Sequence, residues 1–119
     1  MGQVQEINGL WTARFSTDIG TGSGVISLVS GRLLGGDSNY FYSGSYRVDP
    51  TGKAVNGILR VVHFFGPLSN VFGPYRELNL SFAGAVGNGL IIVSARSTIL
   101  SHLTLSVRLE RVERLEELR

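Results

Sequence analysis

Cysteine is absent from this chain of 119 residues. Its absence excludes disulfide bonds, thiolate metal sites and cysteine nucleophiles. Charge is also scarce, because only 17% of the residues are charged whereas 43% are hydrophobic. This composition excludes a disordered chain and leaves fewer surface charges than a typical solvated monomer carries. We therefore expect a partner to cover part of the surface.

The basic residues form no cluster. Eleven Lys and Arg residues and nine Asp and Glu residues are scattered along the chain and leave a net charge of +2. Nucleic-acid phosphates require clustered cations, so we expect no direct binding to nucleic acid. The chain also lacks an export signal at its start and any run approaching the ~20 apolar residues of a membrane helix. We expect a cytoplasmic protein without membrane contact.

What the chain does contain is an alternation of apolar and polar residues with a period of two, which predicts β-strands. Turn signals rich in Gly, Asn and Asp separate these runs. Short connections favour an antiparallel up-and-down barrel, and an open sandwich is the alternative. The sequence thus predicts one all-β domain over residues 1–119, with eight strands near 10–17, 23–30, 31–36, 40–49, 54–64, 75–84, 89–96 and 102–111.

Large aromatic side chains are expected to line the inside of this barrel. The candidates are Trp11, Phe15, Tyr42 and Tyr46, which lie on the predicted strands. Side chains of this size favour a filled barrel, and we expect no cofactor. A hollow barrel that binds a small apolar ligand is the alternative.

Gly35, Gly36 and Asp37 lie between an apolar run and a tyrosine-rich strand. Glycine is free of Cβ strain, and aspartate can accept backbone N–H bonds, so these residues predict a tight turn stabilised by Asp37. Gly44 falls on the inward face of the next strand, where it would relieve crowding or permit a bend.

Three groups of residues could suggest a phosphate, metal or catalytic site, but each has a structural interpretation. The glycine-rich stretch 20–24 precedes a strand-like run rather than a helix, so it predicts a hairpin loop and not a phosphate site. His63 and His102 have no carboxylate at ligand spacing, which argues against a metal site. No nucleophile elbow precedes a helix, and the polar residues show no convergent pair, so we expect no enzymatic activity.

The connection spanning residues 63–75 is long, and loops of this length are often functional. Its apolar residues would cap one barrel end, contact a partner, or gate an apolar ligand. Neighbouring strands also carry apolar residues on both faces, and a homodimer is the simplest cover for them. The expected partner or dimer surface comprises Phe64, Phe65, Leu68, Val71, Phe72, Ile58 and Val62.

The end of the chain changes its period. Val112, Leu115 and Leu118 recur every three residues with charges between them. This spacing predicts a short amphipathic helix that packs on the barrel or on a partner, and a frayed tail is the alternative.

Two motifs in the middle of the chain carry a family resemblance. The sequences GRLLGGD at 31–37 and YSGSY at 42–46, together with NGLWTARFST at 8–17 and a final amphipathic strand, resemble the GrlR-like family over residues 8–110. The resemblance implies an eight-stranded, lipocalin-like barrel that dimerises. It also implies a regulator, because the family's namesake restrains type III secretion by sequestering a transcriptional activator without touching DNA.

One departure from the family concerns the turn after the fourth strand. The namesake carries acidic residues there that engage its partner, whereas this chain has one acid, Asp49, and one base, Lys53. The same partner therefore does not follow from the resemblance. We predict a non-enzymatic regulatory module that binds another protein, and the alternative is a barrel that binds a small apolar ligand.

Overall fold

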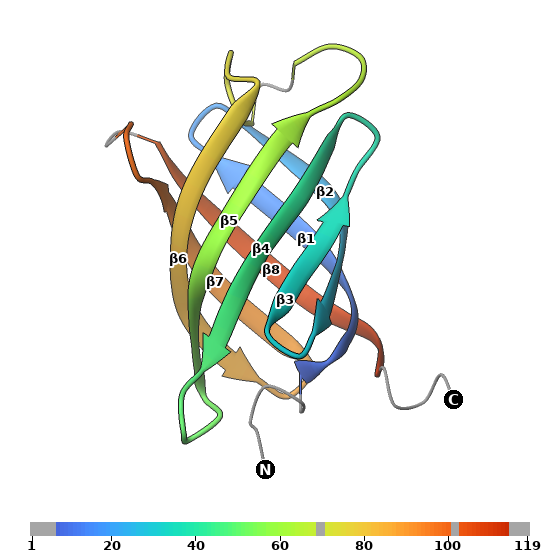
Figure 1. Cartoon of the computed structure of the whole chain (residues 1–119), viewed down its shortest axis with the longest axis vertical. Coiled ribbons are helices and arrows are strands. Elements are labelled where there is room, and N and C mark those ends of the chain that lie inside the picture. The colour runs from blue at the N-terminus through green and yellow to red at the C-terminus, as the bar shows by residue number, and fades with distance from the viewer. Residues whose placement is uncertain (1–6, 69–70, 101–102, 115–119) are drawn as a thin grey trace.

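The computed structural model describes residues 7–68, 71–100 and 103–114. They form eight antiparallel strands that follow one another around a closed barrel (Figure 1). The predicted up-and-down barrel is confirmed, and pairing between the first and last strands closes it. The strands are β1 (Gly9–Thr17), β2 (Gly20–Val29), β3 (Arg32–Gly36), β4 (Tyr40–Val48), β5 (Ala54–His63), β6 (Glu77–Gly87), β7 (Leu90–Ser97) and β8 (Thr104–Arg114).

The alternation in the sequence decides which side chains face inward. On β4, Tyr40, Tyr42 and Tyr46 are buried, whereas Phe41, after the first of them, and Arg47, after the last, are exposed. Successive side chains of a strand point to opposite faces, so one face fills the barrel and the other meets solvent. A row of tyrosines on one face of β4 therefore builds the core.

Glycine allows neighbouring strands to approach closely where the barrel bends. A Cβ atom on Gly44 would lie 2.1 Å from the carbonyl oxygen of Ile58, and one on Gly84 would lie 2.0 Å from that of Ile92. No side chain fits at such distances, so both positions need glycine. This confirms that Gly44 relieves crowding.

Apolar and aromatic contacts close both ends of the barrel. At the lower end in Figure 1, where β1 begins and β8 ends, the Trp11 indole donates a hydrogen bond to the Ile7 carbonyl at 3.0 Å. The Arg111 guanidinium lies 4.7 Å from the centroid of the same ring, which is a cation–π distance. At the upper end, the Phe72 ring lies 4.8 Å from that of Tyr40.

The interior is almost completely filled. One cavity of about 30 Å³ lies beside Tyr46 and Phe82, and another of about 20 Å³ lies beside Phe15 and Tyr42. Each volume is close to what one water molecule needs, whereas ligand pockets measure about 300–1,000 Å³. Neither of these two cavities has room for a ligand of that size without displacement of the side chains that line it.

The expected loop at residues 20–24 is instead the first half of β2, which pairs with β1 up to the pair of Thr17 and Gly20. Cross-strand packing is the reason. A Cβ on Gly22 would lie 3.1 Å from the Phe15 ring, and one on Gly24 would lie 2.7 Å from the Tyr42 hydroxyl. These glycines make room for aromatic side chains in the barrel, and the prediction of a hairpin loop at 20–24 is wrong.

The expected C-terminal helix is wrong for residues 109–114, which belong to β8. In the pairing with β1, Leu10 lies opposite Glu113 and Trp11 lies opposite Arg111, so Val112 is an extra residue in a bulge. A bulge shifts the alternation by one residue, so Val112 departs from the period of two that the rest of β8 follows. The remainder of the predicted helix, including Leu115 and Leu118, lies outside the described residues.

Candidate functional site

The connection between β5 and β6 contributes two residues to the core. Val71 and Phe72 are only 2% and 3% exposed. The Phe72 ring packs against Phe15 at 5.4 Å as well as against Tyr40, and it caps the upper end of the barrel. Leu68 is partly buried against the same core. The expectation that Val71 and Phe72 form a partner surface is therefore wrong, because the barrel uses them to close its own end.

The beginning of the same connection points outward. Phe64 and Phe65 are 55% and 69% exposed. Their backbone is nevertheless fixed, because the Phe64 N–H donates to the Asn39 carbonyl at 2.9 Å and the Asn39 amide donates to the Phe65 carbonyl at 2.9 Å. The two rings are thus presented to solvent on a supported backbone, which reduces the ordering cost of binding.

His63 supports this segment from the end of β5. Its Nδ1 lies 3.2 Å from the Arg76 guanidinium, and its Nε2 lies 2.6 Å from the Gly66 carbonyl. Because arginine only donates, Nδ1 accepts and Nε2 carries the proton that it donates to Gly66. His63 is therefore a hydrogen-bonded strand residue, as expected. His102 lies outside the described residues, among which no group of three or more His, Asp and Glu residues could hold a metal ion.

Exposed apolar side chains gather on the outer face of β2–β5 near the upper end. The strand register places Val25 opposite Gly36, and Gly36 opposite Phe41. Phe41 in turn lies opposite Val62, and its ring is 6.5 Å from that of Phe64. Leu34 lies two residues before Gly36 on the same face of β3. We call these five residues the apolar patch: Val25, Leu34, Phe41, Val62 and Phe64.

Ile58 does not belong to the apolar patch, although it is 61% exposed. It precedes Val62 by four residues on the same face of β5, a separation of about 13 Å. Arg60 lies between them and forms an ion pair with Glu77 at 2.9 Å. Of the surface expected from the sequence, the structure thus brings Phe64 and Val62 together beside Phe41 and leaves Ile58 apart. Phe65 is exposed next to Phe64 in the chain.

The charged side chains on the outward face of the strands that bear the apolar patch are of one sign. The described outward positions of β2–β5 carry Arg32, Arg47 and Arg60 and no acidic side chain. Glu77, on the adjacent β6, is the acid that pairs with Arg60. The face that bears the patch is therefore cationic.

The four aromatic residues expected inside the barrel are all buried, with exposures of 5% or less. This confirms the interior positions of Trp11, Phe15, Tyr42 and Tyr46. Trp11 and Tyr46 lie toward the lower end, and Phe15 and Tyr42 meet edge to face at 5.6 Å toward the upper end. They form part of the packed core.

Asp37 stabilises the turn between β3 and β4, as the sequence predicted. Its Oδ1 accepts the backbone N–H groups of Asn39 and Tyr40, each at 2.8 Å. Its other oxygen accepts the Tyr42 hydroxyl, and burial together with this bond raises the pKa of Tyr42 well above its ordinary value of 10.0. Gly35 and Gly36 lie within β3 itself and not in the turn.

Asp49 closes the turn between β4 and β5 at the lower end of the barrel. Its carboxylate accepts the Thr51 hydroxyl at 2.8 Å and the Lys53 N–H at 3.1 Å. The bond from Thr51 contributes most to a lowered pKa of Asp49. The carboxylate is thus occupied by its own turn, at the opposite end from the apolar patch (Figure 1).

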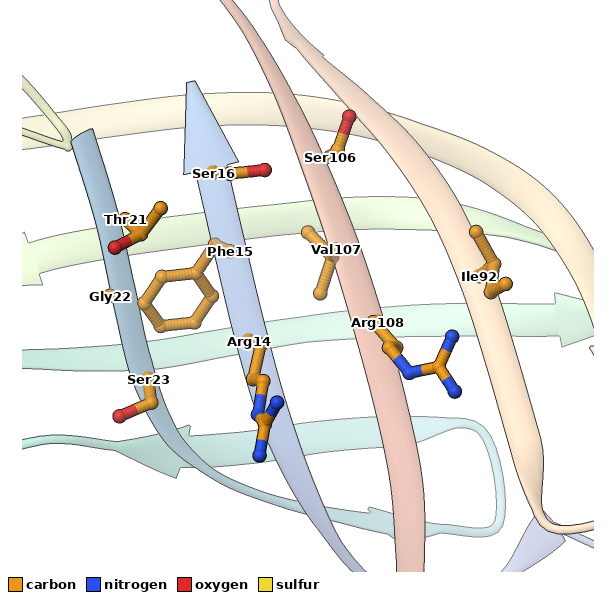
Figure 2. A pocket seen from close by; sticks show the side chains of 10 residues that line it. All are labelled: Arg14, Phe15, Ser16, Thr21, Gly22, Ser23, Ile92, Ser106, Val107 and Arg108. Atoms are coloured by element: carbon orange, nitrogen blue, oxygen red, sulfur yellow. The ribbon is translucent and has the colours of Figure 1, made fainter. Parts of the chain in front are cut away.

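The opposite wall of the barrel, formed by β7, β8, β1 and the first residues of β2, carries a groove of about 740 Å³ on its outer face. Figure 2 shows that Arg14 and Arg108 line it, together with hydroxyl side chains. Ile92 is a large apolar residue at its edge. The outward side chains at this groove are mostly polar, whereas those of the apolar patch are apolar.

Sequence reasoning missed three members of the apolar patch. Phe41 lies between the inward-facing Tyr40 and Tyr42, so alternation alone would have placed it outside. Val25 and Leu34 carried the same signal, because each alternates with buried residues on its strand. What the alternation could not supply is the register that brings these residues into one patch.

Comparison of the chain with models of protein families and with curated proteins finds no match. Among the residues that the structure describes, no helix is long and apolar enough to cross a membrane.

Proposed function

We propose that this protein is a non-enzymatic regulatory module that binds a protein partner through the apolar patch. The observation that carries this proposal is the exposure of apolar side chains on a wall whose inner face is already fully packed. Val25 and Leu34 are each 48% exposed, and Phe41 is 39% exposed. Exposed apolar groups of this kind mark interaction sites, and aromatic residues are enriched in interface cores.

The charge of the surrounding wall indicates what kind of partner fits. A face with three arginines and no acid of its own attracts a segment in which apolar anchors are flanked by acidic residues. A second copy of this chain would bring the same positive charges together, so a different protein is the favoured occupant. A homodimer is the competing outcome, and the mass of the complex separates the two.

The resemblance to the GrlR-like family supports a transcriptional regulator as the class of partner to test first. The proposed mechanism is occupancy, in which the barrel covers an apolar surface that the regulator needs for its own activity. The filled interior favours this function over binding of an apolar ligand, because cavities of about 30 and 20 Å³ are far too small for one.

The test is co-purification of proteins from cell extract with the tagged chain. We expect the wild-type chain to retain a partner that the double variant Phe41→Ser/Phe64→Ser loses. Ile92→Ser is the matched control, because Ile92 is equally apolar and 48% exposed but lies on the opposite wall. Retention of the same proteins by all three chains would contradict the proposal. Light scattering of the purified complex distinguishes a second copy from another protein.

A further inference from the structure

Two rows of polar side chains cross the outer groove on the wall of β2, β1, β8 and β7. The register aligns Thr21 with Ser16, Ser16 with Ser106, and Ser106 with Ser94. The result is four hydroxyl-bearing residues in one line across four strands. All four are on strands whose intervening residues face the core, so this line faces solvent.

The next row of the same wall carries two arginines side by side. Arg14 on β1 lies opposite Arg108 on β8, and Ser23 on β2 lies opposite Arg14. Like charges that lie directly opposite each other on adjacent strands are destabilising. Arg108 is relieved in part by Glu110, whose carboxylate lies 3.1 Å from its guanidinium. Arg14 forms no ion pair among the residues that the structure describes.

We propose that this groove binds the oxyanion of a phosphorylated or sulfated ligand, with Arg14 and Arg108 holding the charge. Guanidinium groups present planar pairs of donors that match phosphate and sulfate oxygens. An anion between the two arginines turns their repulsion into attraction to a common ligand. The hydroxyl row beside them donates and accepts hydrogen bonds, which suits the remaining polar groups of an organic anion.

The groove has the size and openness that such a ligand needs. Its volume of about 740 Å³ lies within the range of small-molecule sites, about 300–1,000 Å³. In Figure 2, the Arg14 side chain extends along β1, away from the hydroxyl row, and that of Arg108 extends toward Ile92. The space above the hydroxyl row is thus left open. Arg14 is exposed and forms no ion pair among the described residues, whereas Arg108 would exchange its contact with Glu110 for one with an anion. The site shares no residue with the apolar patch, which begins two residues after Ser23 at Val25 on β2, and it does not depend on the proposed function.

The experiment is titration of the full chain with sodium phosphate at constant ionic strength, followed in ¹H–¹⁵N spectra. We expect saturable shifts at the amides of Arg14, Ser16, Ser106 and Arg108. Loss of one charge-assisted contact in Arg14→Gln or Arg108→Gln should weaken binding about tenfold. Arg47→Gln is the matched control and should bind as the wild type does, because Arg47 is an exposed arginine on the opposite wall.

Shifts that grow linearly with phosphate, or that are equally reduced in Arg47→Gln and Arg14→Gln, would overturn the proposal, because general screening of positive charge would then explain them. The spectra of each variant without phosphate verify its fold. Glucose 6-phosphate and sulfate complete the set of probes. Tighter binding of glucose 6-phosphate than of phosphate would assign the groove to a phosphate ester, and equal affinity would assign it to the free ion.

Discussion

Two groups of aromatic residues lie back to back across the same strands at the upper end of the barrel. Inside, Tyr40 is 1% exposed and packs against Phe72, whereas outside, its neighbour Phe41 is 39% exposed and lies beside Phe64. Residue type is almost the same in both groups, so burial is what separates their roles. The inner rings stabilise the barrel, and the outer rings are available for binding.

The largest effect is expected on the inner side of this comparison. Phe72→Ser should lower the free energy of unfolding by about 3–5 kcal/mol, because it removes a buried ring that contacts Phe15 and Tyr40 and leaves a cavity. Chemical denaturation measures the change. Phe65→Ser, in the same connection but 69% exposed, should change the stability by less than about 0.5 kcal/mol. Equal losses in the two variants would remove the distinction between the two groups.

Substitution of Asp37 tests how much the turn between β3 and β4 contributes to the stability of the barrel. Asp37→Ala should cost about 2–3 kcal/mol of stability, because the Tyr42 hydroxyl and two backbone N–H groups lose their acceptor. Asp18→Ala, an exposed acid in the turn between β1 and β2, is the control and should be nearly neutral. A loss in Asp37→Ala no larger than that of the control would contradict the role assigned to Asp37.

Alkaline pH tests the same hydrogen bond without disturbing the turn. The folded barrel raises the pKa of Tyr42 above 10.0, so the stability that protonated Tyr42 contributes is fully present below that pH and is lost as the pH rises further. The loss should be at most about 1.4 kcal/mol per pH unit, less the part that solvent screens. Melting temperatures between pH 9 and about 12 should therefore fall more steeply for the wild type than for Tyr42→Phe. Parallel curves would contradict this account.

The smallest effect on stability is expected on the outer side. Phe64→Ser should change the free energy of unfolding by less than about 0.5 kcal/mol, because the ring is 55% exposed and its backbone bond to Asn39 is kept. The same variant should lose the partner. Denaturation and co-purification of one preparation measure both properties, and a large loss of stability would mean that Phe64 belongs with the inner group.

Alternation along single strands was enough to predict much of the fold. It identified the strands, and it placed Trp11, Phe15, Tyr42 and Tyr46 inside. The short connections between strands favoured the barrel over an open sandwich. The turn at Asp37 was predicted from its residue types, because that turn depends on residues close together in the sequence. These features depend on residues that are close together in the sequence, so they can be predicted without knowledge of which strands pair.

Features that depend on pairing were not predictable. The glycines at 20–24 have the composition of a loop, but Gly22 and Gly24 accommodate the rings of Phe15 on β1 and Tyr42 on β4. Val112 breaks the alternation of β8 because it is the extra residue of a bulge in the pairing with β1. Within the long connection, the two phenylalanines that point out and the one that caps the barrel have the same residue type, so only the shape of the barrel end distinguishes them. The apolar patch likewise exists only through the register of β2–β5.

The most direct test of the apolar patch as the partner-binding surface is photo-crosslinking in living cells. A photoreactive phenylalanine analogue replaces Phe64 in one chain and Ser106, on the opposite wall, in another. We predict that position 64 yields a discrete adduct with another protein and that position 106 does not. Adducts at both positions alike, or at neither, would contradict the assignment of the patch, and an adduct with the mass of two copies would identify a homodimer.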